Sequence, residues 1–344
     1  MNIAIILIAL FHFGKLSQAQ LVDDPLTELN CTSNSLSRIL TSLGLKTDAS
    51  FLGAPHHQMA GPVNYTYFLI GPEDATETLV MIPGSGSIIS YWSPVLLQLL
   101  STGTRGRQVM IYDSMGMPLS PISSSNYHPV TTFPVLPISV DGMAQSTYEL
   151  LSALGLSNKN TSILGHSLGG LVALRIAELY GSHLGKIIAA DAPPTGPNAT
   201  LPSSATLSEE LHPTSNLKQL GLLFNLSTRA GVSAACNLVE GSFMISTSIG
   251  ELFANDTTTN AQNQAEKAAD ASAVPFMDLS RISNQVLLIQ GQEDILVPPA
   301  NGILLASAIQ GAWLAQIPNA GHGAIFQDAV QVSALINAFL LPAM

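Results

Sequence analysis

Short apolar runs alternate with amphipathic segments through most of the chain. Between the runs, apolar residues recur every three or four positions, which predicts helices over residues 94–100, 140–154, 168–180, 302–308 and 324–340. The runs themselves are apolar at nearly every position, as in strands buried on both faces: residues 78–82, 108–112, 161–164, 186–190, 285–290 and 312–317. Strands that alternate with helices predict an α/β fold, a mainly parallel sheet with helices on both faces.

The alternation of strands and helices is interrupted once. Residues 192–284 are rich in Ser, Thr, Asn and Ala and contain helical stretches without a strong strand pattern. Because this segment lies between two predicted strands, we expect a mostly helical cap inserted into the fold. The core is then formed by residues 20–191 and 285–344.

Residues 1–19 predict a secretory signal peptide. The apolar run from Ile3 to Phe13 is shorter than the roughly 20 residues that span a bilayer. Small residues at Ser17 and Ala19 precede a predicted cleavage after Ala19. No Lys or Arg precedes the run, so an uncleaved anchor or a buried N-terminal segment is the alternative. No later apolar stretch is long enough for a transmembrane helix, and we expect no transmembrane anchor.

Two further features favour secretion. The only cysteines are Cys31 and Cys236, which either form a disulfide in an oxidising compartment or stay free. Asn-x-Ser/Thr sequons, the acceptors of N-linked glycans, occur at six positions: Asn30, Asn64, Asn160, Asn198, Asn225 and Asn255. We therefore expect a secreted, extracellular glycoprotein. Asn160 is the weakest of these sequons because it directly precedes a predicted buried strand.

Composition and charge exclude several classes of protein. Hydrophobic residues make up 47% of the 344 residues, which is too many for a disordered chain. Lys and Arg number 12 against 23 Asp and Glu, a net charge of −11. With so few basic residues to neutralise phosphates, we expect no nucleic-acid partner.

The candidate chemistry is concentrated at a Gly-x-Ser-x-Gly motif around Ser167. A predicted strand runs into Gly165, His166 and Ser167, and a helical pattern starts at Leu168, which is the context of a nucleophile elbow. The serine occupies a strained turn, so Gly165 and Gly169 must be small enough for strand and helix to approach. The helix N-terminus then points at developing negative charge.

A serine nucleophile requires a base and an acid that orients the base. Asp294 follows the strand predicted at 285–290, and His322 follows the last predicted strand. The order Ser167, Asp294, His322 is the order of an α/β-hydrolase triad, and each residue follows a strand, where open α/β sheets place their sites.

These motifs resemble the α/β-hydrolase fold-1 family from about Tyr65 to Phe339, apart from the cap. The similarity lies in Gly-His-Ser-Leu-Gly-Gly, in Gly-x-x-Asp followed by Val-Pro, and in the Gly-His after the last strand. The resemblance implies Ser167 as nucleophile, His322 as general acid and base, and Asp294 as its partner. It also implies an oxyanion hole formed by the amides of Leu168 and Ser85.

Two loops depart from the family pattern. Pro83 stands where the family usually has His, in the segment that precedes Ser85. In the segment 113–120, Met115 replaces the usual Arg and Pro118 replaces a Gly. These differences change the loops and leave the proposed triad intact.

Other residues compete for these roles. Asp191 ends a predicted strand and Glu293 adjoins Asp294, so each is an alternative acid. His166 is expected to pack or form a hydrogen bond structurally rather than to act as the base. The pair His56-His57 is placed in an N-terminal loop without a third metal ligand, and neither His183 nor His212 has a partner in sequence. Six cap residues line an acyl pocket or belong to the core: Phe224, Phe243, Met244, Phe253, Phe276 and Met277.

A serine nucleophile indicates acyl transfer through an acyl-enzyme without a cofactor. We expect a secreted esterase or lipase-like enzyme, and the few charges favour a small to medium, uncharged ester. The same triad serves aminopeptidases, thioesterases, cofactor-free haloperoxidases and hydroxynitrile lyases, and an inactive binding protein on this scaffold is a further alternative.

Overall fold

The computed structural model describes residues 29–31, 35–102, 106–119, 138–211, 215–249, 256–270 and 277–341. The predicted signal peptide at residues 1–19 lies outside the described residues. The same holds for His212, Phe253, Asn255 and Phe276.

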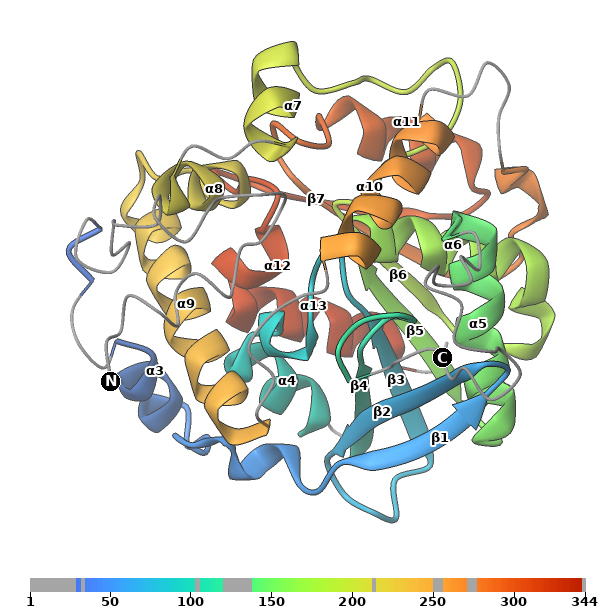
Figure 1. The fold of residues 1–344 in the computed structure, drawn as a ribbon, viewed down its shortest axis with the longest axis horizontal. Helices are drawn as coiled ribbons and strands as arrows, with labels where there is room; N and C mark the ends of the chain where they lie inside the picture. Colours follow the sequence, from blue (N-terminus) through green and yellow to red (C-terminus); the bar gives the residue numbers. More distant parts are fainter. Residues whose placement is uncertain are drawn as a thin grey trace.

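An eight-stranded sheet crosses the molecule in the order β1-β2-β4-β3-β5-β6-β7-β8 (Figure 1). Strand β2 pairs antiparallel with β1 and β4, whereas all pairs from β4 to β8 are parallel. The mainly parallel sheet confirms the predicted fold class. The strands are β1 (His56–Ala60), β2 (Val63–Ile70), β3 (Glu77–Ile82), β4 (Arg107–Tyr112), β5 (Thr161–His166), β6 (Ile187–Ala190), β7 (Val286–Gly291) and β8 (Trp313–Ile317).

The first hairpin was not predicted. Strands β1 and β2 form it, so the placement of His56 and His57 in a loop is wrong. The His56 ring stacks on Tyr67 at 5.2 Å between ring centroids, and His57 Nδ1 lies 3.1 Å from the Thr66 hydroxyl. An edge strand of mixed polarity lacks the continuous apolar run that marks the buried strands.

Helices cover both faces of the sheet (Figure 1). The α-helices are α3 (Ser35–Ser42), α4 (Pro94–Ser101), α5 (Val140–Ala153), α6 (Leu168–Tyr180), α7 (Ser204–Leu211), α8 (Asn216–Leu223), α9 (Arg229–Ile249), α10 (Asp256–Asp270), α11 (Ala300–Ala308), α12 (Ala324–Gln327) and α13 (Ala329–Leu340). Four 3-10 helices are η1 (Ala49–Leu52), η2 (Ile89–Tyr91), η3 (Gly181–His183) and η4 (Leu279–Arg281).

The predicted helix over 324–340 is two helices. Asp328 breaks it, with φ −128° and ψ 55°, and its side chain accepts a hydrogen bond from the amide of Gln331, 3.4 Å away. Asp328 is thus the N-cap at which α13 begins. Its carboxylate satisfies an amide that would otherwise have no partner.

Two apolar cores lie on the two faces of the sheet. Side chains alternate along a strand, so Leu79 and Met81 of β3 face one core and Val80 and Ile82 face the other. Helices α4, α12 and α13 contribute to the first core, and α5, α6 and α11 contribute to the second. The first core also contains residues of α8 and α9, so this part of the inserted segment is packed into the body of the protein.

Helices α7 to α10 fall between β6 and β7, and the described part of 192–284 contains no strand. A disulfide joins Cys236 of α9 to Cys31, with 5.7 Å between the Cα atoms. Next to it, the Leu36 amide of α3 donates to Glu240 of α9 at 2.8 Å. The N-terminal segment is thus attached to the longest described cap helix. Among the described helices, none has the length and hydrophobicity needed to cross a membrane.

Replacing both Cys31 and Cys236 with Ser should lower the free energy of unfolding by about 2–5 kcal/mol. The disulfide closes a loop with a sequence separation of 205 residues, and removing it frees the unfolded chain. Urea denaturation of the parent and variant measures the difference. Equal midpoints and slopes would contradict a stabilising role for the disulfide.

Candidate active site

Ser167 occupies a sharp turn between β5 and α6. Its backbone has φ 56° and ψ −126°, a left-handed conformation that is rare for a residue with a side chain. A Cβ at Gly165 would lie 2.0 Å from the Gly169 carbonyl oxygen, and a Cβ at Gly169 would lie 2.2 Å from the Ile82 carbonyl oxygen. Both glycines are therefore required by close backbone contacts.

The structure brings Ser167, His322 and Asp294 together in one chain of hydrogen bonds. His322 Nε2 lies 2.8 Å from Ser167 Oγ, and His322 Nδ1 lies 2.8 Å from Asp294 Oδ2. A carboxylate only accepts, so Nδ1 carries a proton, and in the neutral ring Nε2 can accept the serine proton. The second carboxylate oxygen accepts the amides of Leu296 and Val297 at 2.9 and 2.8 Å. This arrangement is that of a nucleophile, a base and an orienting acid.

The two alternative acids have other partners. Glu293 is exposed and accepts a hydrogen bond from the side-chain amide of Asn225. Asp191 is fully buried, and its Oδ1 accepts the Gly291 amide at 2.8 Å while its Oδ2 lies 3.7 Å from His166 Nε2. Of the three candidate acids, Asp294 is therefore the one that forms a hydrogen bond with His322.

His166 supports the base without contacting the serine hydroxyl. Its Nε2 donates to the backbone carbonyl of His322 at 2.8 Å, and its ring lies 5.1 Å from the His322 ring. The Tyr91 ring also lies near His166, with 5.9 Å between the ring centroids. His166 thus fixes the position of the loop that carries His322.

Gln290 joins the two buried carboxylates and was missed in the sequence. Its Nε2 lies 3.1 Å from Asp294 Oδ2 and 3.4 Å from Asp191 Oδ1. A signal was present, because Gln290 is a polar residue at the end of an otherwise apolar buried strand, where a side-chain amide needs partners.

The candidate oxyanion hole lies beside the serine. Leu168 is the first residue of α6, so its amide has no acceptor within the helix. Opposite it, a Cβ on Gly84 would lie only 3.2 Å from the Ser167 Cβ, which places the loop of Ser85 against the nucleophile. The cap fixes this loop, because Asn263 hydrogen-bonds the Ser85 hydroxyl and Gln262 accepts the Gly86 amide at 2.9 Å.

The loops that depart from the family pattern are well packed. Asp113 is fully buried and accepts the amides of Ile89 and Leu119 at 2.8 and 3.2 Å. Met115 is buried among apolar side chains, where an Arg would need a charged partner. The change to Met115 is therefore accommodated by hydrophobic packing.

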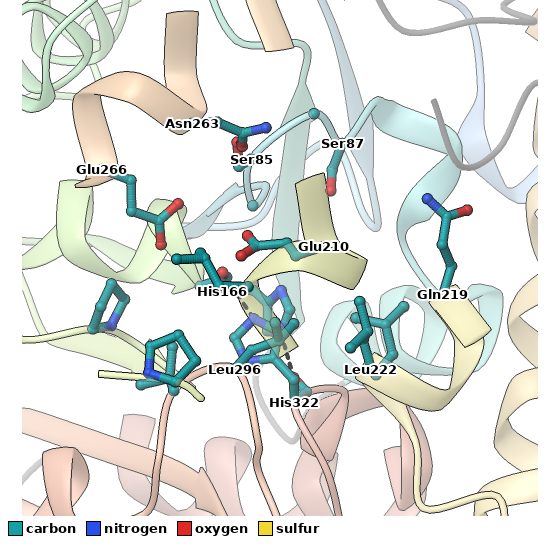
Figure 2. Close-up of a pocket in the computed structure, with 18 of the residues that line it drawn as sticks. Ser85, Ser87, His166, Glu210, Gln219, Leu222, Asn263, Glu266, Leu296 and His322 are labelled. Carbon is teal, nitrogen blue, oxygen red and sulfur yellow. Dashed lines mark hydrogen bonds between the residues drawn. The ribbon is translucent and has the colours of Figure 1, made fainter. Parts of the chain in front are cut away.

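A cavity of about 440 Å³ opens above Ser167 and His322 (Figure 2). None of the described aromatic and methionine candidates of the cap lines it, because Phe224, Phe243, Met244 and Met277 belong to the cores. Phe224 instead packs against Gly323, whose amide donates to the Leu223 carbonyl at 2.6 Å. The apolar side of the cavity consists of Ile88, Pro193, Pro194, Leu201, Pro202, Leu207, Leu222, Leu223, Leu238, Leu296 and Val297.

Residues 77–329 match the family model described as the alpha/beta hydrolase fold. The chain belongs to this family. The RutD protein of Stutzerimonas stutzeri (strain A1501), named as a carbamate hydrolase, is 29% identical over 75% of this chain and 89% of that protein. A 2-hydroxy-6-oxononadienedioate/2-hydroxy-6-oxononatrienedioate hydrolase of a Pseudomonas species is 24% identical, over 81% of this chain and 93% of that protein.

The fold is also similar to solved structures of this family. An alpha/beta hydrolase fold protein from Chitinophaga pinensis aligns with a TM-score of 0.68 and 22% identity, covering 85% of this chain and 99% of that one. Family and relatives together identify the chain as a hydrolase.

Substitution of the three acids should separate their roles. Asp294→Asn should lower kcat for a p-nitrophenyl ester by about 10⁴-fold, because the amide favours the wrong tautomer of His322. Asp191→Asn should cost about tenfold or less, since Asp191 does not contact the base. The matched control, Glu293→Gln, should retain full activity. A loss in Glu293→Gln or Asp191→Asn as large as that in Asp294→Asn would contradict the assignment.

The protonation of His322 predicts a pH profile. Burial by itself lowers the pKa of His322, but the charge and hydrogen bond of Asp294 outweigh it and raise the pKa to about 9. Because the base must be neutral, kcat/KM should rise with pH and level off above about 9. Because the pKa of His322 is higher in the folded protein than its ordinary value of 6.5, protonation of His322 stabilises the fold. This contribution is complete below pH 6.5 and is lost as the pH rises through about 9. A kcat/KM that stays flat from neutral pH upward would contradict this pKa.

Proposed function

We propose that the protein is a serine hydrolase that cleaves carboxylic esters through an acyl-enzyme. The observation that carries this proposal is the continuous hydrogen-bond chain from Ser167 through His322 to Asp294 at the base of a cavity. A proton acceptor at hydrogen-bond distance from a strained, accessible serine is the arrangement that activates a hydroxyl nucleophile.

The first half-reaction forms the acyl-enzyme. His322 takes the proton of Ser167 as the oxygen attacks the ester carbonyl, and the amides of Leu168 and Ser85 stabilise the oxyanion. The protonated His322 then gives its proton to the leaving alkoxide as the carbon–oxygen bond breaks. Asp294 stabilises the imidazolium throughout this step.

The second half-reaction releases the acid. His322 takes a proton from a water molecule, whose oxygen attacks the acyl carbonyl. When the tetrahedral intermediate collapses, the Ser167 oxygen leaves and recovers its proton from His322. His322 returns each proton that it takes, so the enzyme is regenerated at the end of the cycle. Besides the ester and water, the residues of the chain supply every group that the reaction needs.

The charges around the cavity favour an ester without carboxylates over the kind of substrate that the name of the Pseudomonas relative describes. That name describes dioates, which carry two carboxylates. In the described residues that line the cavity of this chain, the carboxylates are those of Glu210 and Glu266, and the basic side chains are Lys267 and two histidines of the candidate site, His166 and His322. This lining repels a dianion.

We also propose that the protein acts in an oxidising, extracellular compartment. The disulfide between Cys31 and Cys236 supports this location, because such bonds persist mainly outside the cytosol. Four of the sequon asparagines have exposed side chains that a glycan can reach: Asn30, Asn64, Asn160 and Asn198. The amide of Asn225 is instead occupied by its hydrogen bond to Glu293.

A fluorophosphonate probe tests the proposed activity. The parent protein should label covalently and cleave p-nitrophenyl esters, and Ser167→Ala should do neither, because the probe needs an activated serine. Esters of increasing chain length then separate an esterase from a lipase. A folded parent protein that neither labels nor cleaves would favour the inactive binding protein.

A further inference from the structure

Charged side chains of two cap helices line the cavity above the candidate triad. Glu210 comes from α7, and Glu266 and Lys267 come from α10. Figure 2 shows the carboxyl groups of Glu210 and Glu266 directed into the same part of the cavity, on the side of His166 and His322. These two carboxylates and one ammonium stand in a lining whose surface is otherwise largely apolar.

Both carboxylates lie within electrostatic reach of the base. The charge of Glu266 helps to raise the pKa of His322. Burial raises the pKa of Glu210, and the positive charges of Lys267 and His322 oppose this rise. A group that interacts with His322 in this way is also close to an ester bond held between His322 and Ser167.

Glu210 is incompletely satisfied by the protein. Among the described residues it has no hydrogen-bond or salt-bridge partner, and Lys267 acts on it only as a nearby charge. A half-buried carboxylate without a hydrogen-bond donor is unfavourable, so a ligand that supplies a positive charge or an N–H donor compensates it.

A buried hydroxyl gives independent support for a polar ligand. Ser90 lines the same cavity with 0% of its surface exposed, and its Oγ has no hydrogen-bond partner among the described residues. Buried polar groups are nearly always paired, so an unpaired one on a cavity wall indicates that a polar ligand completes it. A plain hydrocarbon chain would leave this hydroxyl unpaired, whereas a protonated amine carries N–H donors that a hydroxyl oxygen accepts.

We propose that Glu210 and Glu266 form a subsite for an organic cation, a protonated amine or a quaternary ammonium, next to the scissile carbonyl. The inference rests on the proposed function and names its substrate class, a cationic ester. It replaces the uncharged ester expected from the low content of charged residues, because Glu210 and Glu266 line the cavity above the candidate triad.

Matched pairs of esters test the subsite. Acetylcholine and 3,3-dimethylbutyl acetate have nearly the same shape and differ by one positive charge on the alcohol side. Alanine methyl ester and methyl isobutyrate differ likewise on the acyl side. For each pair, kcat/KM is measured by pH-stat and divided by the spontaneous rate, which corrects for intrinsic reactivity. The pair with the larger preference for the cationic ester shows whether the preferred substrate carries its positive charge on the alcohol side or on the acyl side.

The parent protein should prefer the cationic member of one pair by at least about tenfold, because a partly buried carboxylate attracts the positive charge of the substrate. Glu210→Gln and Glu266→Gln should each lower this ratio, and the double variant should bring it close to one. Lys267→Met should raise the ratio, because it removes a competing ammonium. The matched control is Glu209→Gln, on the same helix but outside the cavity lining, which should leave the ratio unchanged.

Failure of the subsite and failure of the proposed function give different results. Turnover of the neutral esters without a preference for either cation would overturn the subsite and leave the serine hydrolase standing. A ratio that falls equally in Glu209→Gln would also overturn it, because a general charge effect would then explain the preference. Absence of turnover of all four esters, without fluorophosphonate labelling, would overturn both proposals.

Discussion

The turn at Ser167 is the constraint on which the rest of the site depends. A non-glycine residue at φ 56° and ψ −126° is held at a cost of about 1–3 kcal/mol. The surrounding contacts impose this conformation, since the elbow glycines allow β5, α6 and the end of β3 to approach within a few ångströms. The strained turn places the Ser167 hydroxyl beyond the end of β5, and the N-terminus of α6 points toward the place where negative charge develops during the reaction.

The cap completes the site as well as covering it. Helix α10 fixes the loop of Ser85 and Gly86 through Asn263 and Gln262. The end of α8 holds the loop of His322 through the bond from the Gly323 amide to the Leu223 carbonyl. Both the oxyanion side and the base side of the candidate site are therefore attached to the inserted segment. Glu210 of α7 and Glu266 of α10, which line the cavity, belong to the same segment.

The strongest local signals in the sequence predicted the centre of the fold. Buried strands and the elbow combine a continuous apolar run with glycines at fixed spacing, so six strands and the start of α6 could be predicted. The hairpin of β1 and β2 and helix α3 could not, because an edge strand and a short helix owe their stability to tertiary contacts. The break at Asp328 was missed because the apolar periodicity continues across it.

The site was predictable in its order and less so in its surroundings. Strand ends bring Ser167, Asp294 and His322 to one edge of the sheet, and their chain order is the one expected of an α/β-hydrolase triad. Which of Asp191, Glu293 and Asp294 meets His322 depends on side-chain direction, which sequence spacing does not specify. The cavity lining depends on how α7, α8, α9 and α10 pack, so Glu266 and Lys267 could not be assigned to it in advance.

The most direct measurement of the central claim is the covalent intermediate itself. The protein is mixed with an acetate ester, quenched in acid during turnover, digested and analysed by peptide mass spectrometry. The account predicts one acetyl group on the peptide that contains Ser167, and its loss as the substrate is consumed. Ester turnover with no acyl group on Ser167, or with the group on another residue, would contradict it.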